Sequence, residues 1–343
     1  MKIVKIMLNA KRDVYMTAYL QDVGGEFSNL QARPAMIVLP GGGYAACSER
    51  ESDPVALAYA KAGFQTFILH YTVLDKGGWP MPLQDYNTAV AEICAHEKEW
   101  HIYKDKICCV GFSAGGHLAA MAAANAEKRP AVAVLGYPAI HCMPYVPKAE
   151  EYVDKNTSPC FVFGTRTDFL NPTNILDFLS KLTQNDISFE SHIYSYGPHG
   201  YSTGEHCVQP YGTAITPRAT GWVNDSIGFI KEVIGDFAEG KMTEPVVKKH
   251  VNGNHEENLS IRCTLAHLLC RADAIQVIEP VIAAIRSKIP GAACFGMEEE
   301  NEKTRFVCTI LKAYSLQDIL HILKFSQAQI EIFEQKLNDI PNS

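Results

Sequence analysis

The first 240 residues of the chain alternate between short apolar runs and longer helical patterns. The apolar runs, each long enough for one strand, lie at 35–40, 65–71, 106–112, 131–138, 160–165 and 188–196. Helical patterns lie between them at 52–63, 82–99, 115–126 and 171–185, and a further helical pattern follows the last run at 221–237. Runs that are apolar on both faces and joined by helices are typical of parallel strands covered on both sides. The sequence therefore predicts a doubly wound, mostly parallel α/β sheet.

The composition changes after residue 240. A polar connector follows at 241–257, and two helical patterns come later, at 273–289 and 315–337. We therefore expect a large α/β domain at 1–240, a linker at 241–257 and a small helical domain of unknown role at 258–343. The apolar stripe of 315–337 must be buried against another surface, which its own helices, the large domain or a second subunit could provide. The last alternative predicts a homo-oligomer formed through the C-terminal helices.

Charge and cysteine usage narrow the class of protein. Hydrophobic residues make up 47% of the chain and charged residues 20%, and the net charge is -7, so we expect a globular protein without a nucleic-acid partner. Its apolar runs are too short for a secretory signal or a membrane span, and we expect no membrane partner. The eleven cysteines are scattered without a CxxC pair, which favours reduced thiols and a cytoplasmic location.

One serine stands between two glycines in the stretch GFSAG, residues 111–115. Ser113 directly follows a predicted strand and precedes a predicted helix, so it needs a very tight turn. Side chains at Gly111 and Gly115 would collide with the crossing backbone, and glycine removes them. Such a turn lifts the Ser113 hydroxyl out of the sheet and places the positive end of a helix behind it. The pattern predicts a nucleophile, with a purely structural glycine-rich turn as the alternative.

Three glycines, Gly41 to Gly43, directly follow the apolar run at 35–40. Without side chains, their backbone N–H groups can approach a substrate oxygen closely. Acyl transfer needs two or three such donors aimed at the negative oxygen of the tetrahedral intermediate. We predict that Gly42, Gly43 and Ala114, the residue after the serine, supply this oxyanion hole. A flexible loop is the alternative.

A base and an orienting carboxylate follow two later strands. Asp168 comes three residues after the run at 160–165, and His199 lies in the loop after 188–196. Both are expected at the same sheet edge as Ser113, and the order Ser, Asp, His is that of an α/β-hydrolase sheet. His206 is the other candidate for the base. The sequence predicts a Ser113, Asp168 and His199 triad.

Four stretches, LPGGGY, GFSAGGHLAA, FGTRTD and GPHGY, carry a family resemblance. Residues from about 35 to 235 resemble the α/β-hydrolase esterases of the acetyl xylan esterase and hormone-sensitive-lipase-like type. The resemblance implies the triad and oxyanion hole named above and hydrolysis of short acyl esters, often acetyl groups on carbohydrates such as xylan or xylo-oligosaccharides. It implies no metal and no organic cofactor. Pro40 departs from the histidine that many relatives carry before the glycines, which bears on substrate preference.

The expected activity is that of a serine carboxylic ester hydrolase acting on a small ester, for example an acetylated sugar. We expect aromatic side chains to edge an open pocket for this substrate, namely Tyr44, Trp79, Tyr145 and Tyr201. Simple packing of these rings is the alternative. A serine peptidase or amidase of the same fold and a non-catalytic binding protein that keeps the fold are the competing functions.

Overall fold

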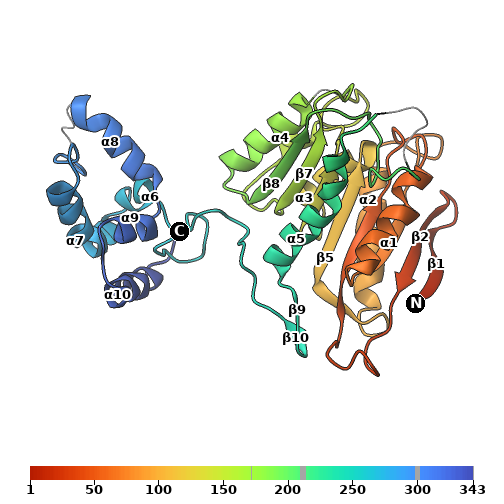
Figure 1. Cartoon of the computed structure of the whole chain (residues 1–343), viewed down its shortest axis with the longest axis horizontal. Coiled ribbons are helices and arrows are strands. Elements are labelled where there is room, and N and C mark those ends of the chain that lie inside the picture. The colour runs from red at the N-terminus through yellow and green to blue at the C-terminus, as the bar shows by residue number, and fades with distance from the viewer. Residues whose placement is uncertain (171, 209–213, 298–301, 343) are drawn as a thin grey trace. The chain divides into compact units, whose positions relative to one another are not determined.

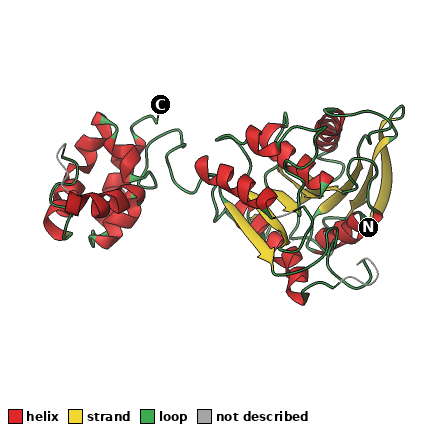
Figure 2. Cartoon of the chain, turned by 90° about the horizontal axis from the view of Figure 1, so that it is seen from above, coloured by secondary structure: helices red, strands yellow, loops and turns green. Residues whose placement is uncertain are grey.

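The computed structural model describes residues 1–170, 172–208, 214–297 and 302–342. The chain divides into two compact units, Met1–Lys249 and His250–Ser343. The first unit carries a large sheet with helices on both faces, and the elements described in the second are helices (Figures 1 and 2). None of the described helices is long and apolar enough to cross a membrane.

The first unit is built on an eight-stranded sheet of order β1-β2-β4-β3-β5-β6-β7-β8. The strands are β1 (Lys2–Asn9), β2 (Val14–Leu20), β3 (Arg33–Leu39), β4 (Gln65–His70), β5 (Ile102–Phe112), β6 (Ala133–Gly136), β7 (Cys160–Thr165) and β8 (Phe189–Tyr194). Strands β3 to β8 run parallel, and β2 pairs antiparallel with both β1 and β4. The mostly parallel sheet expected from the sequence is confirmed, with an N-terminal hairpin added at one edge.

Five helices cover the sheet (Figure 1), namely α1 (Asp53–Lys61), α2 (Met81–Ala95), α3 (Ala114–Asn125), α4 (Thr173–Gln184) and α5 (Trp222–Ile234). Residues of α2, α3 and α4 share one buried cluster, and residues of α1 and α5 share the cluster of the opposite face. Residue 171, where the fourth helical pattern begins, lies outside the described residues. This layering is that of the expected doubly wound fold.

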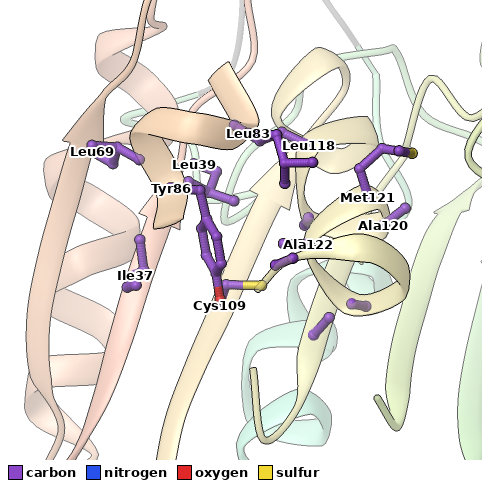
Figure 3. Packing of buried hydrophobic residues seen from close by; sticks show 14 of the residues in the cluster. Ile37, Leu39, Leu69, Leu83, Tyr86, Cys109, Leu118, Ala120, Met121 and Ala122 are labelled. Atoms are coloured by element: carbon purple, nitrogen blue, oxygen red, sulfur yellow. The ribbon is translucent and has the colours of Figure 1, made fainter. Parts of the chain in front are cut away.

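The alanine-rich helix α3 packs very closely on the sheet. Figure 3 shows Leu118 of α3 and Tyr86 of α2 over the sheet face that carries Ile37, Leu39 and Cys109. All five side chains are essentially buried. Because alanine side chains are small, α3 lies close to the sheet, and its first turn is fixed at the carboxyl end of β5.

The first unit ends in a segment that returns to its own surface. Strands β9 (Phe237–Ala238) and β10 (Lys241–Met242) form a short antiparallel pair. Beyond them, Ser188 donates its hydroxyl to the Lys248 carbonyl and its N–H to that of Lys249. Residues 241–249, the first part of the expected linker, thus belong to the first compact unit.

The second unit has its own hydrophobic core. Its helices are α6 (Leu265–Leu269), α7 (Ala272–Lys288), α8 (Glu302–Ala313), α9 (Leu316–Ile322) and α10 (Gln327–Asn338). The apolar side chains of α9 and α10 pack with those of α7, so the stripe at 315–337 is covered by its own unit. That stripe is interrupted because Ser326 begins a new helix, with its hydroxyl accepting the Gln329 N–H.

Candidate active site

Ser113 occupies a sharp turn between β5 and α3. Its φ of 53° is unusual for a residue with a side chain and marks local backbone strain. A Cβ atom on Gly111 would lie 2.0 Å from the Gly115 carbonyl oxygen, and one on Gly115 would lie 2.0 Å from the Leu39 carbonyl oxygen. Both positions therefore require glycine, as expected. Ser113 itself is half-buried, so its hydroxyl is held at the surface of the sheet edge.

A hydrogen-bonded chain joins Ser113, His199 and Asp168. His199 Nε2 lies 2.8 Å from Ser113 Oγ, and His199 Nδ1 lies 2.8 Å from Asp168 Oδ2. Because the carboxylate can only accept, Nδ1 carries the imidazole proton and Nε2 accepts the serine O–H. The Asp168 side chain is only 5% exposed, and its other oxygen accepts the Leu170 N–H at 2.8 Å. This geometry allows His199 to remove the serine proton.

Two neighbouring parallel strands bring the aspartate and the histidine together. In the register of β7 and β8, Thr165 pairs with Tyr194, so the loops that follow leave the sheet side by side. Asp168 and His199 lie on these two loops. His206, the rival base, is exposed, and the Ser113 hydroxyl donates its hydrogen bond to His199.

Three backbone N–H groups lie near the serine without an acceptor among the described residues, those of Gly42, Gly43 and Ala114. The first two follow β3 with φ of 129° and 62°, which suits glycine. Ala114 is the first residue of α3, where helix N–H groups have no partner within the helix. The glycine loop touches the serine turn, since a Cβ on Gly41 would lie 3.0 Å from Ser113 Cβ. The arrangement can bind a negative oxygen.

Two of the four expected pocket aromatics are buried, which corrects the sequence expectation. Tyr44 is 1% exposed and donates its hydroxyl to His117 Nδ1 at 2.8 Å, while Tyr201 is fully buried. Both residues belong to the buried clusters on the two faces of the sheet. Trp79 is half-buried, and Tyr145 is 47% exposed and donates its hydroxyl to the Gly43 carbonyl at 3.0 Å. These two remain candidates for the pocket wall.

Sequence reasoning missed two residues of this region, Glu51 and Phe169. Glu51 is buried behind the glycine loop and accepts the Gly41 N–H at 2.8 Å. Burial raises its pKa, and hydrogen bonds from Tyr137 and Gly41 oppose the rise. Phe169 is 78% exposed, and its ring centroid lies 4.7 Å from that of His199. The position of Phe169 directly after Asp168 was a signal from which it could have been found. Glu51 gave no such signal, because it stands in a polar stretch typical of exposed segments.

Comparisons with known proteins point to one family. The BD-FAE family model, which describes α/β-hydrolase esterases, matches residues 26–194. The solved structure of MGS-M1, an α/β hydrolase from a Medee basin deep-sea metagenome library, is 38% identical with a TM-score of 0.64. That match covers 68% of this chain and 98% of the other.

Two curated bacterial relatives are much longer than the matched segment. Endo-1,4-beta-xylanase B of Butyrivibrio fibrisolvens is 29% identical over 202 residues, which are 48% of this chain and 32% of that protein. Acetylxylan esterase of Xylanibacter ruminicola is 31% identical over 109 residues, 31% of this chain and 22% of that protein. The chain thus spans at most about a third of either relative's length.

Proposed function

The chain belongs to the α/β-hydrolase esterases, and from this premise we propose that it is a serine esterase for short-chain acyl esters, above all acetyl esters. The observation that supports the proposal most is the hydrogen-bonded chain from Asp168 through His199 to Ser113, with both links at 2.8 Å. It stands beside backbone N–H groups that lack acceptors among the described residues. Acyl transfer requires both parts at once.

In the proposed mechanism, Ser113 Oγ attacks the ester carbonyl carbon while His199 Nε2 takes the serine proton. Asp168 holds the imidazole in place and stabilises its positive charge. The carbonyl oxygen becomes negative and accepts hydrogen bonds from the N–H groups of Gly42, Gly43 and Ala114. His199 then protonates the leaving alcohol, and water repeats the attack on the acyl-enzyme to release the acid and free Ser113.

We propose acetylated carbohydrates, such as xylo-oligosaccharides, as the substrate class. The names of the two curated relatives support xylan-derived substrates. The leaving alcohol must depart next to His199, which gives it a proton, and the exposed ring of Phe169 also lies against His199. An aromatic face there suits the apolar face of a sugar ring. A cytoplasmic location and the absence of nucleic-acid and membrane partners remain predictions.

A substrate panel tests this function. We expect the full chain to hydrolyse 4-nitrophenyl acetate faster than the butyrate and far faster than the octanoate, and to release acetate from acetylated xylo-oligosaccharides. Ser113→Ala is expected to abolish all of these activities. A preference for an aminoacyl anilide would instead establish a peptidase or amidase, and an unreactive wild-type protein would indicate a binding role.

A further inference from the structure

Glu51 lies directly behind the glycine loop. It ends the short 3-10 helix η1 (Glu49–Glu51), and it is 3% exposed. Its Oε2 accepts the Gly41 N–H at 2.8 Å. A Cβ on Gly41 would lie 2.7 Å from Glu51 Oε2 and 3.0 Å from Ser113 Cβ, so Gly41 is held between the carboxylate and the serine. The carboxylate thereby fixes the start of the segment that carries Gly42 and Gly43.

The other carboxylate oxygen reaches the loop that carries His199. Tyr137 donates its hydroxyl to Glu51 Oε1 at 2.6 Å, and the Tyr137 oxygen accepts the Ser202 N–H at 3.0 Å. The Tyr137 ring packs edge-on against the His199 ring, with centroids 5.0 Å apart. One buried carboxylate is therefore linked both to the glycine loop and, through a buried phenol, to the ring and the loop of the proposed base.

The neighbouring residue strengthens this link. Arg50 Nη1 donates to the Gly200 carbonyl at 3.0 Å, and the Ser202 hydroxyl donates to the Arg50 carbonyl at 2.5 Å. Gly200 directly follows His199. Arg50 and Glu51 together tie the segment after β3 to the loop after β8, although about 150 residues separate them in the sequence.

A buried carboxylate is costly unless hydrogen bonds satisfy it, and a purely structural loop clamp does not require a charge. Here the two oxygens of the Glu51 carboxylate accept hydrogen bonds from donors on different loops, the Gly41 N–H and the Tyr137 hydroxyl. The Tyr137 hydroxyl binds this negative charge, and the Tyr137 ring contacts the imidazole that becomes positive during the proposed reaction. Each of these effects is greatest in the transition state.

We propose that Glu51 is a positioning residue for the esterase reaction, holding the oxyanion donors through the Gly41 N–H and His199 through the Tyr137 hydroxyl. The inference rests on the proposed function, since it assigns Glu51 a part in that reaction. Because both held groups act on the transition state, loss of the carboxylate should lower kcat and leave KM nearly unchanged.

Glu51→Gln tests the inference with little change in shape. An amide has one acceptor oxygen and one donor nitrogen, so it cannot accept from both Gly41 and Tyr137 as the carboxylate does. We expect kcat for 4-nitrophenyl acetate to fall about tenfold to a hundredfold. This fall is no larger than the fall in kcat that removal of one oxyanion donor causes in other enzymes. Glu49→Gln is the matched control, because it removes the same charge from an exposed residue of the same short helix.

Tyr137→Phe distinguishes the Glu51 contact to Tyr137 from its contact to Gly41. It also tests the inference if Glu51→Gln does not fold. It keeps the contact between Glu51 and Gly41 and removes the hydrogen bonds that join Glu51 through Tyr137 to the His199 loop, so kcat should again fall with KM nearly unchanged. The loss in the double variant should be smaller than the product of the two single losses, because both substitutions break one network. The rate of fluorophosphonate labelling should fall in parallel, and circular dichroism with thermal melts checks that each variant is folded.

Several outcomes would overturn the inference. One is a folded Glu51→Gln or Tyr137→Phe protein with the kcat of the wild type. Others are an equal loss in Glu49→Gln, or a higher KM at unchanged kcat. A wild-type protein that hydrolyses no ester and binds no fluorophosphonate would instead overturn the proposed function, and this inference with it.

Discussion

Two aromatic rings flank the imidazole of His199. Tyr137 is buried on one side, with ring centroids 5.0 Å apart, and Phe169 lies on another at 4.7 Å. Phe169 differs from Tyr137 because most of it is exposed, and in the proposed mechanism we expect it to contact the leaving alcohol.

Phe169→Ala should therefore change substrate preference as well as rate. We expect kcat/KM for acetylated xylo-oligosaccharides to fall about tenfold, because a lost aromatic contact with the sugar ring is worth about 1 kcal/mol or more. Ethyl acetate, which has no ring, should lose less. Phe306→Ala removes a similarly exposed phenylalanine from the second unit and is the control. Equal losses on both substrates would contradict the leaving-group role.

The sequence predicted those site residues whose position follows from backbone geometry. The spacing of Gly111 and Gly115 around Ser113 indicated the turn because a side chain there would meet backbone atoms. Burial of loop side chains was not predictable in the same way. Tyr44 follows the glycines and was expected at a pocket edge, but its ring turns inward to His117.

Among the helices, α3 combines the serine turn with a buried histidine. His117 is fully buried, and its Nε2 lies 2.8 Å from the Pro147 carbonyl. Since that carbonyl can only accept, Nε2 carries the proton and Nδ1 accepts the Tyr44 hydroxyl. Burial lowers the pKa of His117 to about 4 from 6.5, so the ring stays neutral in the folded protein at mildly acidic pH.

This depressed pKa predicts a loss of stability in acid. Between pH 6.5 and about 4 the unfolded chain protonates His117 and the folded chain does not, so the free energy of unfolding falls as the pH falls. The contribution amounts to about 2 kcal/mol between pH 7 and pH 5. Urea unfolding at both pH values should show a smaller decline for His117→Gln than for wild type.

His206→Gln, which replaces an exposed histidine, provides the control and should keep the wild-type decline. An equal decline in wild type and His117→Gln would show that other groups cause the acid effect. The absolute stability of His117→Gln does not enter the comparison, because only its change with pH is used.

Elements were predictable where the apolar pattern was strong. The parallel strands β3 to β7 carry buried apolar runs because helices cover both sheet faces, and the expected runs match them. The edge strand β8 was also expected, although most of its residues are exposed or half-buried. The hairpin of β1 and β2 was not among the predicted strands. Strand β1 forms the sheet edge and its residues are exposed or half-buried, so it lacks a continuous apolar run.

Each of the two units has its own core, as the separate buried clusters show. The match to the BD-FAE family model, residues 26–194, lies wholly in the first unit. The separate match to the structure of MGS-M1 covers 98% of that chain but only 68% of this one. We therefore expect the first unit to fold by itself. The composition change after residue 240 signalled two parts, but sequence patterns could not place the contacts of 241–249.

A truncated chain of residues 1–249 should therefore keep its chemistry. We expect kcat/KM for 4-nitrophenyl acetate close to that of the full chain, because every residue of the proposed mechanism lies in this unit. Any self-association through the C-terminal helices, one of the alternatives that the sequence left open, should be lost in size-exclusion chromatography. A folded but inactive truncation would show that the second unit contributes to the site.

Peptide mapping after fluorophosphonate labelling identifies the nucleophile directly, since the reagent bonds only to an activated nucleophile. We predict a single adduct on Ser113 in the wild-type chain, its near absence in His199→Ala and full labelling in His206→Ala. An adduct on another residue, or labelling that depends on His206 and not on His199, would contradict the proposed triad.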